Sequence, residues 1–280
     1  MSDALAAVAD RLRCPHCGSA MTCDDRTVAC AEGHRFDRAR GGGVTLLGPG
    51  AELPPGDTDA MLAARDAFLG AGHYAPLTDA IAAACPAVDR ACLVDVGAGT
   101  GHHTAGVLDA RPGWTGIALD ASRTATRRAA RAHPRLAAIA CDATAPLPVR
   151  DSGADVLLSV FSPRNAAEFA RVLAPAGVLV VASATEDHLA EAVGPLGLIG
   201  VQPQKRARLH ERLAPDLVSV ALRHVRIPLA LDHAALEQLA GMGPTAFHAT
   251  PEEIAARVAA VPEPFTVTAV VTVETFARAT

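Results

Sequence analysis

Short apolar runs recur through the middle of the chain, and each ends at a glycine, an aspartate or another polar residue. Five of these runs have the length of a buried strand: 92–96, 114–119, 136–140, 155–161 and 177–182. Segments with a helical pattern lie between them, for example 122–133 and 166–173. Strands and helices that alternate in this way predict a parallel sheet covered by helices on both faces.

The segments on either side of this region follow other patterns. Residues 48–56 are rich in glycine and proline and predict a loop. Residues 57–68 predict a helix that begins at one of the polar residues 57–59. Residues 265–273 are rich in β-branched side chains and predict an added edge strand or an antiparallel strand.

These patterns divide the 280 residues into three parts. We expect a small module at 1–47, a connector with a helix at 48–85, and a catalytic domain at 86–280. The length suits one ordinary domain plus an accessory module. The predicted fold class is α/β, a Rossmann-like sheet with a zinc-ribbon-like N-terminal module.

Composition and charge limit the compartments and the kinds of partner expected for the protein. Half of the residues are hydrophobic, yet no uncharged apolar stretch is long enough for a membrane helix, so no membrane partner is expected. The first ten residues lack the basic start of a signal peptide, which predicts a cytoplasmic protein. The net charge of −5 argues mildly against nucleic acid as a partner, although local charge decides that question.

The cysteines predict a metal site in the N-terminal module. Cys14 and Cys17 are separated by two residues, and Cys30 and His34 by three. Such spacing lets two pairs of donors converge on a tetrahedral zinc ion, and four protein ligands make a structural site. Cys23 and His16 are spare donors that leave the assignment open. The alternative is a set of free thiols in a reduced domain.

A glycine-rich loop follows the first strand of the catalytic domain. Gly97, Gly99 and Gly101 permit a tight turn and close approach of a ligand, and Asp95 precedes them. Nicotinamide and flavin enzymes use a similar loop, but their fingerprint places the third glycine one residue later. Asp95 is suited to organise the loop or to meet the methionyl amino group of S-adenosylmethionine.

Two further aspartates follow successive strands. Asp120 ends the second strand, where a carboxylate can accept both ribose hydroxyls, and Asp142 follows the third, where it can accept from the adenine amino group. Each alone is more often a cap or turn residue. Three acids at the carboxyl edge of one sheet favour a nucleoside site. S-adenosylmethionine has no pyrophosphate, so its binding loop need not form a phosphate cradle. The predicted cofactor is therefore S-adenosylmethionine.

With these features in order, the chain resembles the RlmA family of 23S rRNA guanine-N1-methyltransferases, and within it the TlrB-like, macrolide-resistance subgroup. The most specific part of the resemblance is the string at 71–77, Ala-Gly-His-Tyr-Ala-Pro-Leu. The paired metal donors, residues 34–37 and residues 56–58 extend it through most of the chain. It implies methylation of guanine N1 in hairpin 35 of 23S rRNA, with guanine 748 favoured. The residues leave open whether the enzyme has a housekeeping role or confers resistance to macrolides such as tylosin.

The resemblance also implies roles for individual residues. The zinc ligands would be Cys14, Cys17, Cys30 and His34, and the cofactor contacts would include Tyr74, Gly99, Thr100 and His188. Without it, Tyr74 reads equally well as a core aromatic and His188 as a surface residue.

The sequence departs from the family pattern in two places. A Tyr-Ala-Pro-Cys-like run is replaced by Phe-Ser-Pro-Arg at 161–164, in the loop expected to face the target base. We expect Phe161 to stack on that base and Asn165 to hydrogen bond with it. Glycines at 41–43 replace a more ordinary sequence and predict a looser connection to the zinc module.

RNA binding would require a basic surface despite the acidic total. The best candidate is a cluster of basic residues within 205–226. Arginines also decorate the zinc module, and others recur at 123–135, where a solvated helix face is the favoured interpretation. By resemblance, a homodimer whose cleft accepts the RNA hairpin is expected.

Two other functions fit part of the sequence. A methyltransferase for a small natural product would keep the glycine loop but would need neither zinc module nor basic cluster. A zinc-ribbon binding protein could sense the cofactor without catalysis. The acceptor of the guanine N1 proton is not identified by the sequence, and His102 and His103 are guesses.

Overall fold

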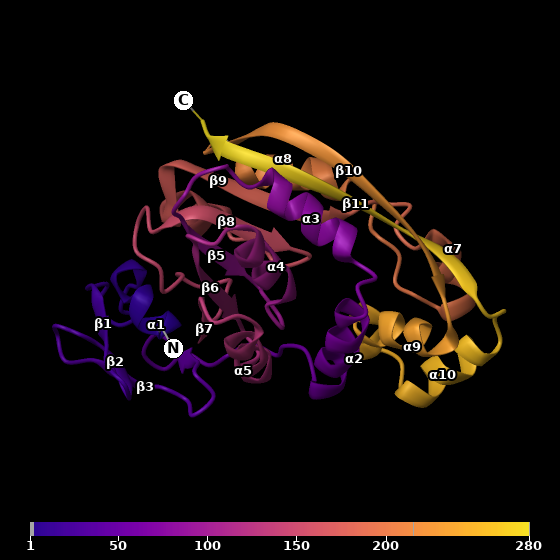
Figure 1. Cartoon of the computed structure of the whole chain (residues 1–280), viewed down its shortest axis with the longest axis horizontal. Coiled ribbons are helices and arrows are strands. Elements are labelled where there is room, and N and C mark those ends of the chain that lie inside the picture. The colour runs from indigo at the N-terminus through magenta and orange to yellow at the C-terminus, as the bar shows by residue number, and fades with distance from the viewer. Residues whose placement is uncertain (1–2, 215, 280) are drawn as a thin grey trace.

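The computed structural model describes residues 3–214 and 216–279. Its centre is an eight-stranded sheet in the order β10-β11-β9-β8-β5-β6-β7-β4, and a separate three-stranded sheet, β1-β2-β3, lies in the N-terminal module (Figure 1). The strands are β1 (Met21–Cys23), β2 (Thr27–Cys30), β3 (Arg35–Asp37), β4 (Val44–Thr45), β5 (Cys92–Val96), β6 (Thr115–Asp120), β7 (Leu136–Ala140), β8 (Ala154–Val160), β9 (Leu173–Ala184), β10 (Leu217–Leu231) and β11 (Phe265–Arg278).

The helices that connect and cover these strands are mostly short. They are α1 (Ala4–Ala7), α2 (Asp59–Gly70), α3 (Ala75–Ala84), α4 (His102–Ala110), α5 (Arg123–Ala132), α6 (Ala166–Val172), α7 (Ala190–Leu196), α8 (Lys205–Leu213), α9 (His233–Gly241) and α10 (Pro251–Ala259), with 3-10 turns η1 (Ala9–Arg11) and η2 (Pro244–Phe247). Thr58 caps α2, as one of the three predicted candidates. Among the described residues, no helix is both long and apolar enough to cross a membrane.

The predicted parallel sheet is confirmed, and the order of its strands reverses near the middle of the sheet. β5 pairs in parallel with both β6 and β8, β6 continues to β7, and β8 continues to β9. The strand order therefore reverses direction at β5. In open sheets of this kind, ligands bind beyond the carboxyl ends of the strands at that reversal.

The last strand was predicted only in part. β11 is antiparallel to β9, as one alternative required, but it is not an edge strand, because β10 pairs with its other side along almost its whole length. β10 escaped prediction because arginines, a histidine and a proline interrupt its apolar residues. Its first half has both faces exposed, so no regular alternation marks it.

The N-terminal module packs directly on the catalytic sheet. β4 pairs in parallel with β7, and the amide of Leu46 donates to the carbonyl of Ala140 at 2.9 Å. The expectation of a loose connection was wrong. A Cβ on Gly43 would lie 2.9 Å from the Thr126 side chain and 3.2 Å from a β7 carbonyl, so a glycine is what allows the close approach.

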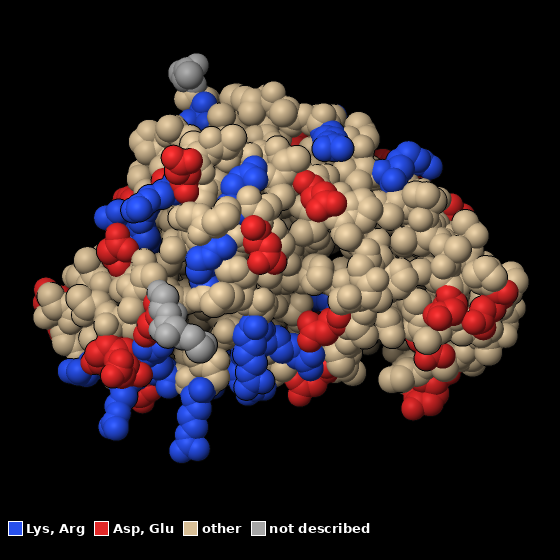
Figure 2. Space-filling model, in the orientation of Figure 1, with Lys and Arg blue, Asp and Glu red and all other residues tan. Residues whose placement is uncertain are grey.

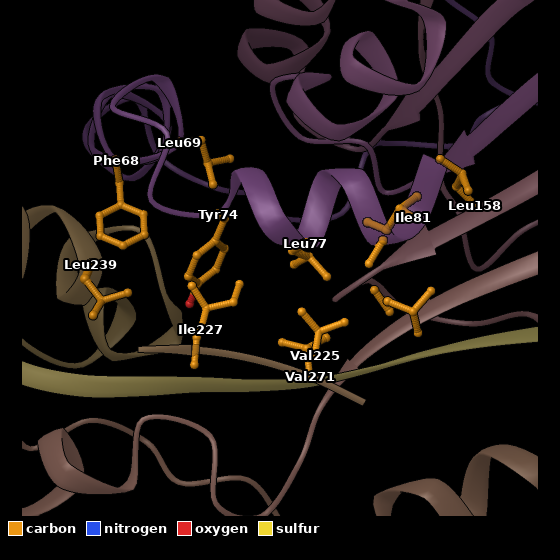
Figure 3. Close-up of a cluster of buried hydrophobic side chains, with 14 of the residues drawn as sticks. Phe68, Leu69, Tyr74, Leu77, Ile81, Leu158, Val225, Ile227, Leu239 and Val271 are labelled. Atoms are coloured by element: carbon orange, nitrogen blue, oxygen red, sulfur yellow. The ribbon is translucent and has the colours of Figure 1, made fainter. Parts of the chain in front are cut away.

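The core on the other side of the sheet lies between α3 and the strands β10 and β11 (Figure 3). Leu77 and Ile81 of α3 are fully buried there and face Val225 and Val271 (Figure 3). Tyr74 begins α3 and is 3% exposed. This packing fixes the start of α3 at the rim of the sheet.

A small helical lobe stands beside the sheet. α2 packs on α9, and α9 packs on α10, although these segments are far apart in the sequence (Figure 1). The guanidinium of Arg65 on α2 links the start of α2 to the end of α9, because it pairs with Asp57 and donates to the carbonyl of Met242 at 2.9 Å. The lobe faces the carboxyl ends of the strands.

Candidate active site and metal centre

Four side chains of the N-terminal module converge on one point. The ligand atoms of Cys14, Cys17, Cys30 and His34 all lie within 4.8 Å of one another. The Cys17 and Cys30 sulfurs are 3.6 Å apart, and the Cys30 sulfur is 3.4 Å from Nδ1 of His34. Tetrahedral zinc with bonds of about 2.0–2.3 Å needs edges of about 3.3–3.8 Å, so this donor set fits zinc.

The two spare donors face elsewhere. Nε2 of His16 lies 3.1 Å from the carbonyl oxygen of Leu47. The Cys23 thiol donates to the carbonyl of Asp24 and receives a hydrogen bond from Arg38. The geometry therefore separates both from the group of four.

The glycine loop lies between β5 and α4, at the reversal of the sheet. Gly97 has φ +76°, and a Cβ there would lie 2.4 Å from the Cβ of Ser162. The Ser162 hydroxyl donates to the carbonyl of Val96 at 2.5 Å. Glycine at 97 thus serves the turn and also lets the loop after β8 close onto the cofactor loop.

Asp95 is the buried acid of this loop. It is 2% exposed, its Oδ2 accepts from the Thr104 hydroxyl, and its Oδ1 has no hydrogen-bond partner among the described residues. Burial raises the pKa of Asp95 to about 6, with the charge of Asp120 adding to the rise and the Thr104 hydrogen bond opposing it. An unpartnered buried carboxylate oxygen suits a cationic ligand group such as an amine.

Asp120 and Asp142 hold the neighbouring loops. Asp120 accepts from the amides of Gly99 and Ser122, both at 2.8 Å. Burial raises its pKa. Asp142 uses Oδ1 for the amide and hydroxyl of Thr144. Both aspartates also face the cavity described next, so cap and ligand roles are compatible here.

A cavity of about 920 Å³ lies between the sheet and the helical lobe. It adjoins most of the residues singled out from the sequence, which are Tyr74, Asp95, Gly97, Gly99, Thr100, His102, His103, Asp120, Asp142, Phe161 and His188. Gly101 (φ +78°) instead caps α4 behind the loop, where a Cβ would meet Ala129 and Leu136. Tyr74 is both a core residue and a cavity residue.

Phe161 and His188 form one side of this cavity. Phe161 follows β8 with φ +53°, which is strained for an aromatic residue, and the residue is 42% exposed. The ring centres of Phe161 and His188 are 6.1 Å apart. The Val270 amide donates to Nδ1 of His188 at 3.1 Å, and burial lowers the pKa of this histidine, which keeps it neutral.

Asn165 lies beside an adjoining smaller cavity of about 310 Å³. Its Oδ1 caps α6 by accepting from the Glu168 amide, and its Nδ2 donates to the carbonyl of Thr144 at 3.0 Å. The side chain therefore braces the loop after β8. Phe161 alone of the two points toward the larger cavity.

The sequence did not reveal several cavity residues. Arg65, Leu239 and Phe247 come from the lobe, whose approach to the sheet has no local signature. His103 lies 2.8 Å from the Thr78 hydroxyl, and burial lowers its pKa to about 3, so the ring is neutral. Unlike those three residues, His103 is named from the sequence, together with His102, as a guess for the acceptor of the guanine N1 proton.

Basic side chains are distributed over several surfaces. Figure 2 shows them along one edge of the molecule, over the zinc module and α5. The predicted 205–226 cluster is divided between α8 and β10. Lys205, Arg208 and Arg212 face the large cavity, whereas Arg206 pairs with the buried Glu274 and Arg226 pairs with Asp187.

This sheet order, the acid-lined cavity at its reversal and the Cys3His group define an S-adenosylmethionine-dependent methyltransferase that carries a zinc ribbon. Residues 93–177 match the model of the methyltransferase domain, and residues 12–49 match the model described as RlmA, N-terminal. The solved structures of BH2331 from Bacillus halodurans and YcgJ from Bacillus subtilis share the fold. Their TM-scores are 0.52 and 0.50, at 12% and 14% identity, over 72% and 74% of this chain and 99% and 100% of theirs.

Curated relatives are much more similar in sequence. The 23S rRNA (guanine(748)-N(1))-methyltransferase of Streptomyces fradiae is 46% identical, over 90% of this chain and 91% of its own length. A relative from Micromonospora griseorubida is also 46% identical, over 93% of this chain and 95% of its own length. The chain belongs to the RlmA family of 23S rRNA (guanine-N1)-methyltransferases.

Proposed function

We propose that this enzyme methylates N1 of guanine 748, in hairpin 35 of 23S rRNA, and thereby protects the ribosome against macrolides such as tylosin. The Streptomyces relative, named for that guanine, supports the position. The observation that carries the proposal is one cavity that joins the glycine loop to the exposed ring of Phe161. Such a protein acts on ribosomes in the cytoplasm.

S-adenosylmethionine, when bound, supplies an electrophilic methyl group on its sulfonium. Asp95 would hold the amino group through its unpartnered oxygen, and Asp120 and Asp142 would accept from the ribose and the adenine. Gly97, Gly99, Thr100 and Gly101 would shape the loop around it, with Tyr74 and His188 closing the sides. Alignment of donor and acceptor supplies much of the rate in such a transfer.

Guanine N1 lies on the Watson–Crick edge, so the base must be unpaired or turned out of its stack before it can react. Phe161 would stack on the extruded base, since its ring is exposed at the carboxyl end of β8. Asn165 would fix the loop that carries this ring. The N1 proton leaves to a side chain or to water. Burial lowers the pKa values of His102 and His103, which makes both rings weak proton acceptors and favours water.

Zinc held by Cys14, Cys17, Cys30 and His34 would shape the N-terminal module for RNA contact. We also propose a homodimer. β10 is the edge strand of the sheet, and Val218, Val220 and Leu222 on it are 46%, 58% and 37% exposed. An exposed apolar edge strand is a surface that a second chain can cover.

The test is a map of reverse-transcription stops on 23S rRNA that lacks this modification. After incubation with the enzyme and S-adenosylmethionine, a new stop at guanine 748 is expected, because an N1 methyl group blocks base pairing. A stop at a neighbouring guanine would correct the position. No stop, despite bound cofactor and zinc, would contradict the proposal and favour a small-molecule substrate.

A further inference from the structure

A group of four basic side chains faces the active-site cavity without acidic partners. Arg164 lies in the loop after β8, and Lys205, Arg208 and Arg212 come from α8. Within residues 3–214 and 216–279, none of the four lies within ion-pair distance of a carboxylate. By contrast, Arg206 on the same helix forms an ion pair with Glu274.

Arg164 is the most unusual of the four. Its Nη2 donates to the Ser183 hydroxyl at 2.7 Å, whereas its Nε is buried and has no hydrogen-bond partner in the described part of the chain. Burial lowers the pKa of Arg164, and the charge of Arg212 lowers it further. A half-buried guanidinium beside a second one is costly unless an anion joins them.

The position of this pair indicates which anion. Arg164 and Arg212 line the smaller cavity with Thr144 and Asn165, and both also line the large cavity next to Phe161. The site is therefore adjacent to the place where the target base would stack. Thr144 hydrogen bonds to Asp142, which follows β7, whereas Asp95 lies on β5, two strands away in the sheet. The methionyl carboxylate of the cofactor, expected near Asp95, is therefore not the natural occupant.

We propose that Arg164 and Arg212 form a subsite for the backbone phosphate next to the methylated guanine. This inference rests on the proposed RNA substrate. Guanidinium groups bind phosphate through paired hydrogen bonds, and a clamp on the flanking phosphate would hold the nucleotide in its extruded position. Lys205 and Arg208 extend the charged path along α8.

α8 is itself held firmly enough to carry this role. The buried carboxylate of Glu274 accepts from Arg206 at 3.1 Å and from the Ser219 hydroxyl at 2.6 Å, and Nε2 of His210 lies 2.9 Å from it. Through these contacts, one face of α8 packs against the β10–β11 pair. The opposite face is left to the cavity.

The experiment measures binding of a hairpin 35 RNA to the intact enzyme over a series of salt concentrations. R212Q and R164Q should each weaken binding by about tenfold and lower the slope of log Kd against log salt by about one, as expected for one lost phosphate contact. R164K keeps the charge and should keep most of the slope. The matched control is R90Q, which alters an exposed arginine just before β5 that lines neither cavity and lies outside the 205–226 cluster.

A second RNA carries an uncharged methylphosphonate at the phosphate beside the target guanine. It should bind the wild type more weakly and bind R164Q and R212Q no more weakly than the unmodified RNA does. Equal slopes for wild type, R212Q and R164Q would overturn the subsite, as would weakened S-adenosylmethionine binding in R164Q with unchanged RNA binding. If the wild type neither binds nor methylates the hairpin, the proposed function itself fails.

Discussion

At the scale of single residues, Asp95 shows how burial prepares a group for its ligand. The carboxyl is almost inaccessible to solvent, it lies at the end of β5, and one of its oxygens is unpartnered among the described residues. A bound ammonium group would stabilise the negative charge of the Asp95 carboxylate, which burial disfavours. The site thus trades stability of the free enzyme for affinity.

The pH dependence of cofactor binding follows from this residue. Because the pKa of Asp95 is raised to about 6, the carboxyl is protonated as pH falls through 6, and S-adenosylmethionine affinity should then decline. The same rise makes the free fold lose stability as pH increases from about 4 to 6. D95N should bind about tenfold more weakly at pH 8 and show a flatter profile, measured by calorimetry.

The control for this prediction is D109N, which alters an exposed aspartate of α4. It should bind the cofactor as the wild type does. A wild-type affinity that stays constant from pH 5 to 8 would show that Asp95 does not carry the interaction.

Single residues of the sequence predicted local structure where one side chain has one strong conformational preference, while their contacts with the cofactor stay predictions. Three glycines and three aspartates at strand ends predicted the loop, since few other functions need that order. The sequence could not place Asn165, whose amide caps a helix in preference to facing the large cavity. The sequence also shows no sign of a role for Arg164, because that role depends on Arg212 and Ser183, which are its neighbours only in the folded structure.

At the scale of elements, the zinc module depends on ligands rather than on a large core. Its three strands have three or four residues each, too few to be stable alone. C17S should therefore lose zinc and lower the melting temperature, measured by metal analysis and thermal unfolding. C23S should retain both, because Cys23 lies outside the group of four.

An excess of chelator should reproduce the effect of C17S on the wild type. A C17S protein with full zinc content and an unchanged melting temperature would rule out the assigned ligands. Equal losses in C17S and C23S would indicate that either thiol supports the module.

The elements themselves were predictable where hydrophobic periodicity was clean. All five central strands were found, although β9 extends well beyond the predicted 177–182. β10 was missed, because its side chains alternate between core and solvent only in its second half. Its pairing with β11 is a tertiary contact that no local pattern encodes.

At the scale of the whole molecule, the exposed edge of β10 should decide the oligomeric state. V220E places a charge at the most exposed valine of that edge, so the proposed homodimer should dissociate into monomers. Light scattering after gel filtration measures the mass. V88E is the control, since Val88 is 48% exposed and lies outside β10.

A V220E protein with the mass of a dimer would place the interface elsewhere. A wild type that is monomeric at every concentration tested would remove the homodimer proposal. Neither result would affect the assignment of the cofactor cavity, which lies within one chain.

The pairing of β4 with β7 has a consequence for how the enzyme depends on its surroundings. The metal-binding module and the catalytic sheet share backbone hydrogen bonds, so we expect that neither part folds independently of the other. A shorter chain starting after residue 47 would leave β7 with an open edge, ready to pair with other chains. Scarcity of zinc in a cell would then lower the methylation activity, because loss of the metal would loosen the sheet that carries the cofactor site.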